Sequence, residues 1–486
     1  PMKISPARVA MLLGPWATGG GPLYVALADA LRAAIERGEL PEGTVLPPER
    51  ELAGRLHVSR TTVVGAYGAL KEAGVLASRQ GRGTWVAAAA AAGDAGQVAF
   101  SGELYSNLMG AGGDVIELTA AAPFPTRVVA EETARLAGDG LAARVTGVGY
   151  LPAGLAELRE RIAEVHTAQG LPTRPDEVLV TTGAQQAINL VTQLFGEPGQ
   201  AVLVEEATYP GALDAARAVG MRPVGAALDD SGVVVEAVEE LMDRVRPRFA
   251  YLVPVHQNPT GSVLSESRAR AIAELSARYR VPVVEDMALR ELRLVDRPAP
   301  APVASHDPEA LVISIGSTSK VLWAGLRVGW IRAPRAIIER LVQLKMRSDL
   351  GSDVLSQVIA AAVLPRLDDA VAERRDGLRA GHAALAAALS RHLPDWTWDT
   401  PPGGCILWVR IPDGDAREFA QVSQRYGVTI VPGQVLSAAG GHADRLRIPY
   451  VLDAPVLEEA ARRLALAWSA YRGGAAAPES PAAIIV

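Results

Sequence analysis

The chain has 486 residues, a formal net charge of −6, 49% apolar residues and a single cysteine, Cys405. This length predicts two or three domains, and the apolar fraction is sufficient for a large core. The negative balance excludes a protein that binds polyanions over its whole surface, and one cysteine excludes a disulfide framework or a cysteine-rich zinc site. No run of about twenty uncharged apolar residues predicts a membrane span, and a single cysteine suits a reducing cytosol, so we expect a cytoplasmic protein. Seven scattered histidines and one cysteine predict no metal site.

Changes in composition divide the chain. Six consecutive alanines beginning at Ala87, followed by many glycines, are typical of a linker. We expect loosely structured residues before the first domain and a disordered Ala/Pro-rich tail after the last. The predicted units are residues 1–21, a compact domain at 22–86, the linker at 87–115, a large domain at 116–472, and the tail at 473–486.

The compact domain begins with three predicted helices. Apolar residues at helical spacing predict the first helix over 23–37. Pro47 and Pro48 favour the start of a second, short helix. Ser59 is a good N-cap for a third helix that continues to Ala73. This spacing is typical of a helix-turn-helix, and the basic turn at 79–84 predicts a hairpin wing.

The start of the third helix carries Arg60, Thr61 and Thr62, where recognition helices meet bases and phosphates. A small docking domain with ordinary surface arginines would show similar helices. The longer string LPPERELA, from Leu46 to Ala53, followed by VSRTTV, resembles the winged helix of GntR-type bacterial regulators throughout 22–86. The resemblance implies a double-stranded DNA-binding surface made by Arg50, Ser59, Arg60, Thr61, Thr62, Arg82 and Gly83.

The large domain alternates short apolar runs with helical patterns. This order predicts an α/β fold with a mostly parallel sheet covered by helices, followed by a smaller α+β part over 370–472. The predicted strands are 178–182, 201–205, 249–254, 281–285, 311–316 and 328–332, and the predicted helices include 185–194, 265–279 and 335–345.

Lys320 lies in the run STSKVLWAGLR, between Ser317 and Arg327. A lysine after a hydroxyl-rich turn, with an arginine seven residues later, suits a pyridoxal 5′-phosphate site. The amine would form a Schiff base with the cofactor aldehyde, while Ser317 and Arg327 would hold its phosphate.

Four further segments fit the same ligand. Gly183 and Ala184 open a helix whose N–H groups could bind a phosphate, and Tyr209 could stack on a pyridine. Asn258 could donate to the ring oxygen, and Asp286 could pair with the ring nitrogen. Each also has an ordinary explanation: a turn, a packed ring or a helix cap. Together, at the carboxyl ends of predicted strands, they favour one ligand site.

These motifs resemble the fold-type I, class I aminotransferases over about 116–472. The resemblance implies that Tyr150 reaches the phosphate of a neighbouring subunit in a homodimer, and that Arg447 binds a carboxylate. A GntR-type domain joined to such a domain is the layout of the MocR family of bacterial regulators. That family resemblance implies subunits exchanged head to tail.

Two positions depart from the family pattern. Ala288 and Leu289 stand where a tyrosine usually bonds the cofactor ring oxygen, and Ala184 stands where a hydroxyl residue often assists the phosphate. We therefore expect a cofactor-dependent DNA-binding regulator that senses the cofactor or an amine, with little physiological turnover. An active aminotransferase with an accessory DNA-binding domain, and a DNA-binding scaffold without cofactor, are the alternatives.

Overall fold

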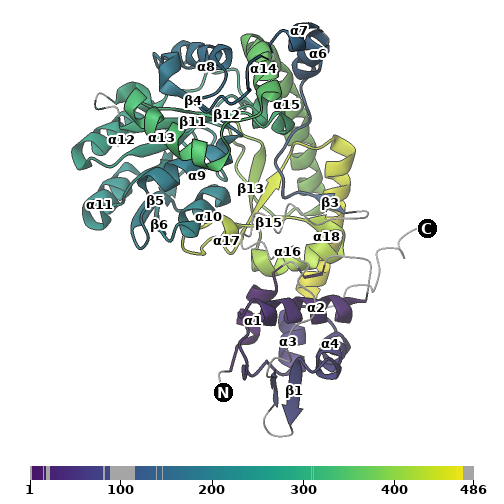
Figure 1. Cartoon of the computed structure of the whole chain (residues 1–486). Helices are drawn as coiled ribbons and strands as arrows, with labels where there is room; N and C mark the ends of the chain where they lie inside the picture. The colour runs from purple at the N-terminus through teal and green to yellow at the C-terminus, as the bar shows by residue number, and fades with distance from the viewer. Residues whose placement is uncertain are drawn as a thin grey trace.

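A computed structural model describes residues 3–14, 16–17, 22–79, 83–87, 115–137, 139–144, 146–307, 309 and 311–473. We call residues 3–87 the head and residues 115–473 the body. Figure 1 shows the head at one end of the molecule, directly below α16 and α18 of the body. The predicted linker, apart from its two end residues, and nearly all of the predicted tail lie outside the described residues.

The head is a helical bundle with a small hairpin. The Ser59 hydroxyl caps the third predicted helix by accepting from the Thr62 N–H at 3.1 Å. Leu27, Leu31 and Leu70 are fully buried in the head core. The elements are α2 (Leu23–Glu36), α3 (Glu49–Arg55), α4 (Arg60–Glu72), β1 (Leu76–Arg79) and β2 (Gly83–Val86), and β1 pairs antiparallel with β2.

The expectation of loose structure before residue 22 is wrong for one segment. Residues Pro6–Leu13 form helix α1, capped by the Ser5 hydroxyl, which accepts from the Arg8 N–H. Val9, Leu13 and Trp16 join the apolar core of the head. The helix is short, and Gly14 and Pro15 follow it, so its apolar residues did not form a periodic pattern long enough to predict a helix.

The body is built on a mostly parallel sheet, as predicted; it has seven strands, one more than predicted, in the order β4-β12-β11-β10-β9-β5-β6. Its neighbours are parallel except β12, which is antiparallel to both β4 and β11. The carboxyl ends of β9, β10 and β11 therefore meet at one edge. The strands are β4 (Val178–Thr181), β5 (Ala201–Glu205), β6 (Arg222–Ala226), β9 (Ala250–Leu252), β10 (Val283–Asp286), β11 (Val312–Ser317) and β12 (Gly329–Arg332).

Helices cover both faces of this sheet, because alternate side chains of each buried strand point to opposite faces. One apolar cluster joins the sheet to α9 (Ala184–Phe195), α10 (Pro210–Ala218) and α13 (Arg335–Ser348). Four helices cover the opposite face: α8 (Ala156–Ala168), α11 (Val235–Val245), α12 (Glu266–Tyr279) and α14 (Val354–Val363). A short hairpin of β7 (Leu228–Asp229) and β8 (Gly232–Val233) lies with them.

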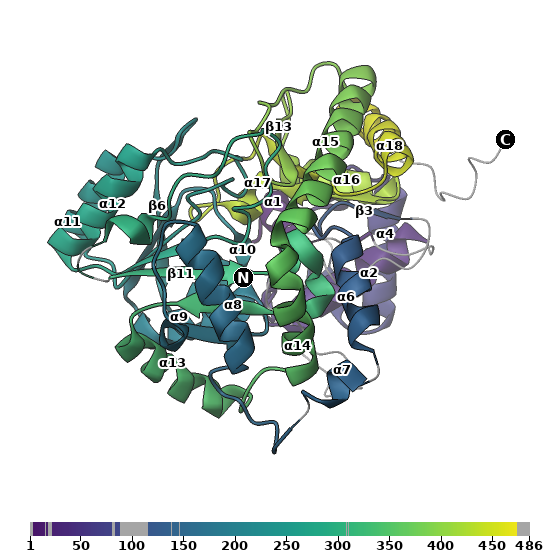
Figure 2. The same ribbon diagram turned by 90° about the horizontal axis from the view of Figure 1, so that it is seen from above.

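A smaller domain follows, as predicted. Its three-stranded antiparallel sheet has the order β13-β16-β15, and Figure 2 shows α15 and α18 lying beside each other over it. β3 (Ile116–Glu117) pairs with β14, so the body begins in this small domain. The other elements are α15 (Leu367–His392), β13 (Ile406–Arg410), α16 (Ala416–Arg425), β14 (Val428–Thr429), β15 (Val431–Pro432), α17 (Gly433–Leu436), β16 (Arg445–Pro449) and α18 (Ala454–Gly473).

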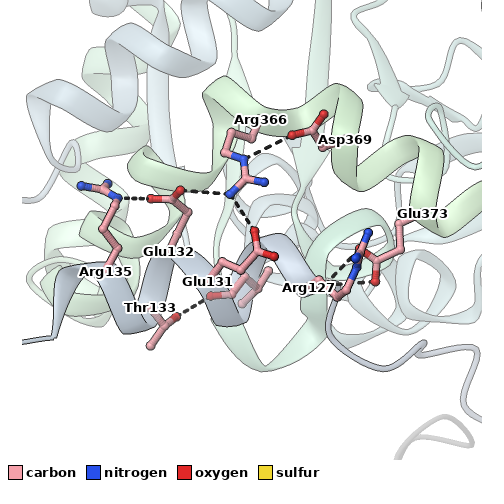
Figure 3. A network of polar contacts seen from close by, with 9 residues as sticks. Arg127, Glu131, Glu132, Thr133, Arg135, Arg366, Asp369 and Glu373 are labelled. Atoms are coloured by element: carbon pink, nitrogen blue, oxygen red, sulfur yellow. Dashed lines mark hydrogen bonds and ion pairs between the residues drawn. The ribbon is translucent and has the colours of Figure 1, made fainter.

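An ion-pair network joins α6 (Arg127–Leu136) to α15 (Figure 3). The short α7 (Asp139–Ala142) follows α6. Arg366 contacts Glu131 at 2.9 Å and Glu132 at 3.2 Å. The Arg127 N–H donates to the Glu373 carboxylate at 3.0 Å. Most partners are exposed, so the network contributes more to the orientation of α6 than to stability. It fixes the preceding segment, residues 118–126, against the body.

The head contacts the small domain of its own chain through α16 and α18. Gln421 donates to the Ala10 and Gly14 carbonyls, each at 3.1 Å. Arg425 donates to the His57 carbonyl at 2.6 Å, in the turn between α3 and α4. Glu418 lies 2.5 Å from Arg55 and 3.6 Å from the His57 ring. Tyr471 of α18 stacks obliquely on His57 with ring centres 4.8 Å apart.

None of the helices in the part of the chain that the structure describes combines the length and apolar character needed to span a bilayer.

Candidate functional site

A cavity of about 210 Å³ opens at the strand ends of the central sheet, between the large and small domains. Several segments of the large domain, the segment of Ala121 and two segments of the small domain form its walls. The structure brings eight of the predicted site residues into this cavity: Ala184, Tyr209, Asn258, Asp286, Ser317, Lys320, Arg327 and Arg447.

Lys320 lies on a single π-helical turn, Ser319–Trp323, directly after β11. Its Nζ donates to the Ala121 carbonyl at 2.7 Å, on the segment that α6 anchors. Loss of solvation lowers the pKa of Lys320, while the neighbouring Cys405 and Asp286 oppose the shift. An amine with a depressed pKa is more readily neutral, and the neutral amine is the nucleophile.

Asp286 ends β10 with both carboxylate oxygens engaged. The Tyr251 hydroxyl donates to Oδ2 at 2.7 Å, and the Ala288 N–H donates to Oδ1 at 2.8 Å. Burial raises the pKa of Asp286, whereas these two hydrogen bonds and the charge of Lys320 lower it. Tyr251 was not predicted as a site residue. The sequence offered one indication of such a role: Tyr251 lies on β9, seven residues before the candidate residue Asn258.

The cationic end of the cavity lies between α9 and Arg327. Gly183 caps α9 with a φ of 121°, a conformation that favours glycine. The Arg327 Nη2 donates to the Thr182 carbonyl at 2.5 Å, and a Cβ at position 183 would lie 3.0 Å from that nitrogen. Ser317 donates to the Ser319 hydroxyl at 2.9 Å beside them. Helix N–H groups, hydroxyls and a guanidinium together suit a phosphate.

Arg447 of β16 reaches across the cavity. Its Nε donates to the Asn258 side chain at 3.2 Å, and its Nη1 donates to the Thr119 carbonyl at 2.9 Å. Burial lowers the pKa of this guanidinium. A half-buried planar guanidinium in a cavity is suited to hold a carboxylate through two parallel bonds.

Four other residues differ in their position relative to the cavity. Tyr150 is 67% exposed and does not line the cavity, so its contact with a partner subunit stays a prediction. Trp323, next to the lysine turn, is 40% exposed and also lies outside the lining. His256 and the buried Cys405 do line it. The Nδ1 of His256 contacts the Leu289 carbonyl at 2.9 Å.

The residues present fit pyridoxal 5′-phosphate. A lysine amine, a carboxylate fixed by two donors and an amide surround a cavity large enough for a pyridine ring. Gly183 and Arg327 supply a cradle that a side chain at position 183 would fill. Ala288 and Leu289 also line the cavity, so the usual phenolic donor is replaced by apolar side chains.

The candidate DNA-binding residues that the structure describes lie at the starts of α3, α4 and β2. Arg50, Arg60 and Thr61 are exposed, at the starts of α3 and α4. The Ser59 hydroxyl contacts Thr61 Oγ1 at 2.7 Å and Thr62 Oγ1 at 2.8 Å, so Ser59 acts as a cap within the turn. Gly83 begins β2 and is exposed, and Arg82 lies outside the described residues.

Glu205, at the end of β5, is fully buried beneath the cavity. Its Oε2 accepts from Gln257 at 3.0 Å, from the Val253 N–H at 3.2 Å and from Thr208 at 3.3 Å. Burial raises the pKa of Glu205 to about 8, against the opposing effect of these three donors. The carboxyl is therefore protonated in the folded protein at neutral pH.

Comparisons with known proteins match both parts of the chain. Residues 114–464 match the family model "Aminotransferase class I and II", and residues 23–86 match "Bacterial regulatory proteins, gntR family". An uncharacterized HTH-type transcriptional regulator, YisV of Bacillus subtilis (strain 168), is 30% identical over 88% of this chain and 92% of its own length. The 2-aminoadipate transaminase of Thermus thermophilus is 34% identical over 70% of this chain and 86% of its own length.

The fold is shared with solved structures. LysN, an alpha-aminoadipate aminotransferase from Thermus thermophilus complexed with N-(5′-phosphopyridoxyl)-L-leucine, superposes with a TM-score of 0.69 and 32% identity. The match covers 76% of this chain and 95% of LysN. These matches confirm the predicted α/β fold class and the predicted pairing of a GntR-type head with an aminotransferase-like body.

We predict that Glu205→Gln flattens the pH dependence of stability. Between pH 4.5 and about 8 the unfolded Glu205 ionises while the folded one keeps its proton, so the free energy of unfolding of the wild type falls over this window. Glutamine keeps the acceptor and cannot ionise. The variant should gain about 2–4 kcal/mol at pH 8, since one pKa unit corresponds to about 1.4 kcal/mol.

Urea unfolding at several pH values measures this effect. Glu206→Gln is the matched control, because Glu206 is the next residue and its side chain is 46% exposed. Parallel stability profiles for the wild type and Glu205→Gln would contradict the prediction.

Proposed function

Because the chain belongs to the aminotransferase class I and II family and carries a head of the gntR family of bacterial regulators, we propose that it is a transcriptional regulator whose body controls DNA binding in response to pyridoxal 5′-phosphate or an amine. The observation that carries this proposal is the contact of Arg425 with the His57 carbonyl. It joins the helix-turn-helix to the domain that also supplies Arg447 to the cavity.

The cofactor of this domain is pyridoxal 5′-phosphate, in agreement with the relatives and their solved complexes. When bound, it supplies an aldehyde that combines with amines and a ring that withdraws electrons. Lys320 would hold it covalently, Asp286 would face the ring nitrogen, and Arg327 with the start of α9 would hold the phosphate. Tyr251 orients Asp286 through the hydroxyl bond described above.

A path of direct contacts supports coupling between the cavity and the head. Cys405 and Arg447 line the cavity from the small domain. α16 packs against β14 and β15 of that domain, and β15 pairs with β16, the strand of Arg447. α16 then contacts the head at the turn before the recognition helix. Suppose that the small domain can take two positions relative to the large domain. A ligand with a higher affinity for one of them would favour that position, and the head would move with the small domain.

Weak or absent turnover fits the apolar side chains of Ala288 and Leu289. Without a phenolic donor to the ring oxygen, the site would bind its ligand with less support for proton transfer. The presence of Lys320, Asp286 and Arg447 in one cavity favours a second candidate, an active aminotransferase whose head anchors it to DNA. Repeated conversion of an amino acid to its keto acid would support that candidate.

A homodimer fits the exposure of the loop before α8. Val148 is 86% exposed and Tyr150 is 67% exposed, which suits a loop that a second subunit covers. In an exchanged dimer, the contacts between α16 and His57 would join the body of one subunit to the head of the other. The regulator would act on promoter DNA in the cytoplasm.

Lys320→Ala tests the sensing step. We expect the cofactor to change the DNA affinity of the wild type by at least about fivefold, the lower range of allosteric coupling, and to leave that of Lys320→Ala unchanged. Operator titrations with and without pyridoxal 5′-phosphate measure the effect. Borohydride reduction followed by peptide mass analysis locates the modified lysine. Equal affinities in all four titrations would reject the sensing step.

Arg425→Met tests the path to the head. The variant should bind both the cofactor and DNA, and the cofactor should no longer change its DNA affinity, because the contact with the His57 carbonyl is lost. Arg391→Met, which removes an exposed arginine of α15, is the control and should behave as the wild type. Full coupling in Arg425→Met would show that the signal takes another route.

Arg60→Ala tests the DNA-binding surface. We expect a loss of about 1–3 kcal/mol in operator binding, with cofactor binding unchanged, because Arg60 is exposed at the start of the recognition helix. Arg37→Ala, at the far end of α2, removes a head arginine that pairs with Glu39 and should have little effect. Equal losses for both variants would point to a general charge effect.

A further inference from the structure

A second, smaller cavity adjoins the cofactor cavity and takes no part in the proposed function. Its volume is about 40 Å³, and it shares Ser317 and Ala288 with the larger cavity. α8 contributes His166, its C-cap residue is Gln169, and the segment after β10 contributes Arg290. Apolar side chains of the lysine turn and of residues 364–367 complete the wall.

The cavity is lined by buried hydrogen-bond donors that lack partners. Arg290 is 5% exposed, and its Nε and Nη1 have no hydrogen-bond acceptor, while its Nη2 makes one long bond of 3.4 Å to the Ala299 carbonyl. His166 is 1% exposed. Its Nε2 accepts from Trp330 at 2.9 Å, so the ring proton lies on Nδ1, which also has no partner. Unpaired buried donors of this kind are costly.

The charges around these donors do not balance. The nearest carboxylate oxygen to Arg290 is Glu291 Oε1, 3.7 Å from Nε, and that oxygen already accepts from Gln169 at 2.9 Å. The buried Glu285 accepts from the Val303 and Ala304 N–H groups and from Ser314, and its charge acts on Arg290 only from a distance. Arg293 and Arg332 add positive charge near Arg290 and His166 respectively.

We propose that this cavity is a binding site for a small monovalent anion of the halide class, with chloride as the probe. The N–H groups of Arg290 and His166 would donate to it, and its charge would offset the excess of arginines. A water needs about 10–15 Å³ of such volume, so the cavity holds one halide or about three to four waters and is too small for a phosphate ester. Ser317 and Thr318 form its wall on the side of Lys320, which places the anion next to the cofactor turn.

A crystal of the full chain soaked in sodium bromide tests the site directly. We expect an anomalous bromide peak within hydrogen-bond distance of Arg290 Nη1 and His166 Nδ1. Ordered water without an anomalous signal at that position would overturn the proposal. This experiment needs neither DNA nor added cofactor, so its failure would leave the proposed function untouched.

Thermal unfolding in solution separates a functional site from one filled only at crystal concentrations. At constant ionic strength, replacing sodium gluconate by sodium chloride should raise the wild-type midpoint saturably, by about 1–3 °C. Arg290→Leu should show no rise, and in gluconate it should be at least as stable as the wild type, because it removes buried N–H donors that have no hydrogen-bond acceptor. Arg297→Leu, which removes an exposed arginine of the following loop, should keep the full chloride effect.

An equal chloride effect in wild type and Arg290→Leu would overturn the proposal, as would a bromide peak accompanied by no chloride effect in solution. If Arg290→Leu does not fold, His166→Phe replaces it, because it removes the Nδ1 donor and preserves an aromatic ring against Trp330.

Discussion

The hydrogen bond from Arg447 to Asn258 joins the two halves of the body across the cavity. One partner lies on the small domain and the other on the loop that follows β9, so the bond holds the small domain over the strand ends. The second bond of Arg447, to the Thr119 carbonyl, also fixes the segment whose Ala121 carbonyl receives Lys320. A ligand carboxylate that competes for this guanidinium would therefore loosen several contacts together.

The small domain supports both candidate functions of the molecule. It completes the cavity through β13 and β16, and it holds the head through α16 and α18. Its core is rigid: Trp396, Phe419 and Trp468 pack edge to face with ring centres 5.2–5.6 Å apart. A rigid support transmits displacement without absorbing it, since closely packed cores resist continuous deformation.

The sequence was sufficient to predict the strands and turns that carry charged or glycine-rich motifs. Lys320, Asp286 and Asn258 follow buried strands, and the order of those strands in a parallel sheet brings their ends together. The antiparallel direction of β12 and the presence of β6 were not predicted, because pairing direction depends on contacts far apart in the chain.

Residues without a motif were also missed. Tyr251 and Arg290 are ordinary residues within or beside strands, and their roles arise from the side chains that the fold places next to them. Cys405 is buried, and its position beside Lys320 follows only from the way the small domain closes. Tertiary proximity of this kind has no signature in local spacing.

Three hydrogen bonds from the body reach main-chain carbonyls of the head. Gln421 binds the Ala10 and Gly14 carbonyls, and Arg425 binds the His57 carbonyl. A carbonyl oxygen is present whatever side chain the residue carries. The residues of α4 that are proposed to contact DNA can thus diverge in evolution without loss of these three bonds, and chimeras that fuse foreign heads of the same backbone to this body should retain them.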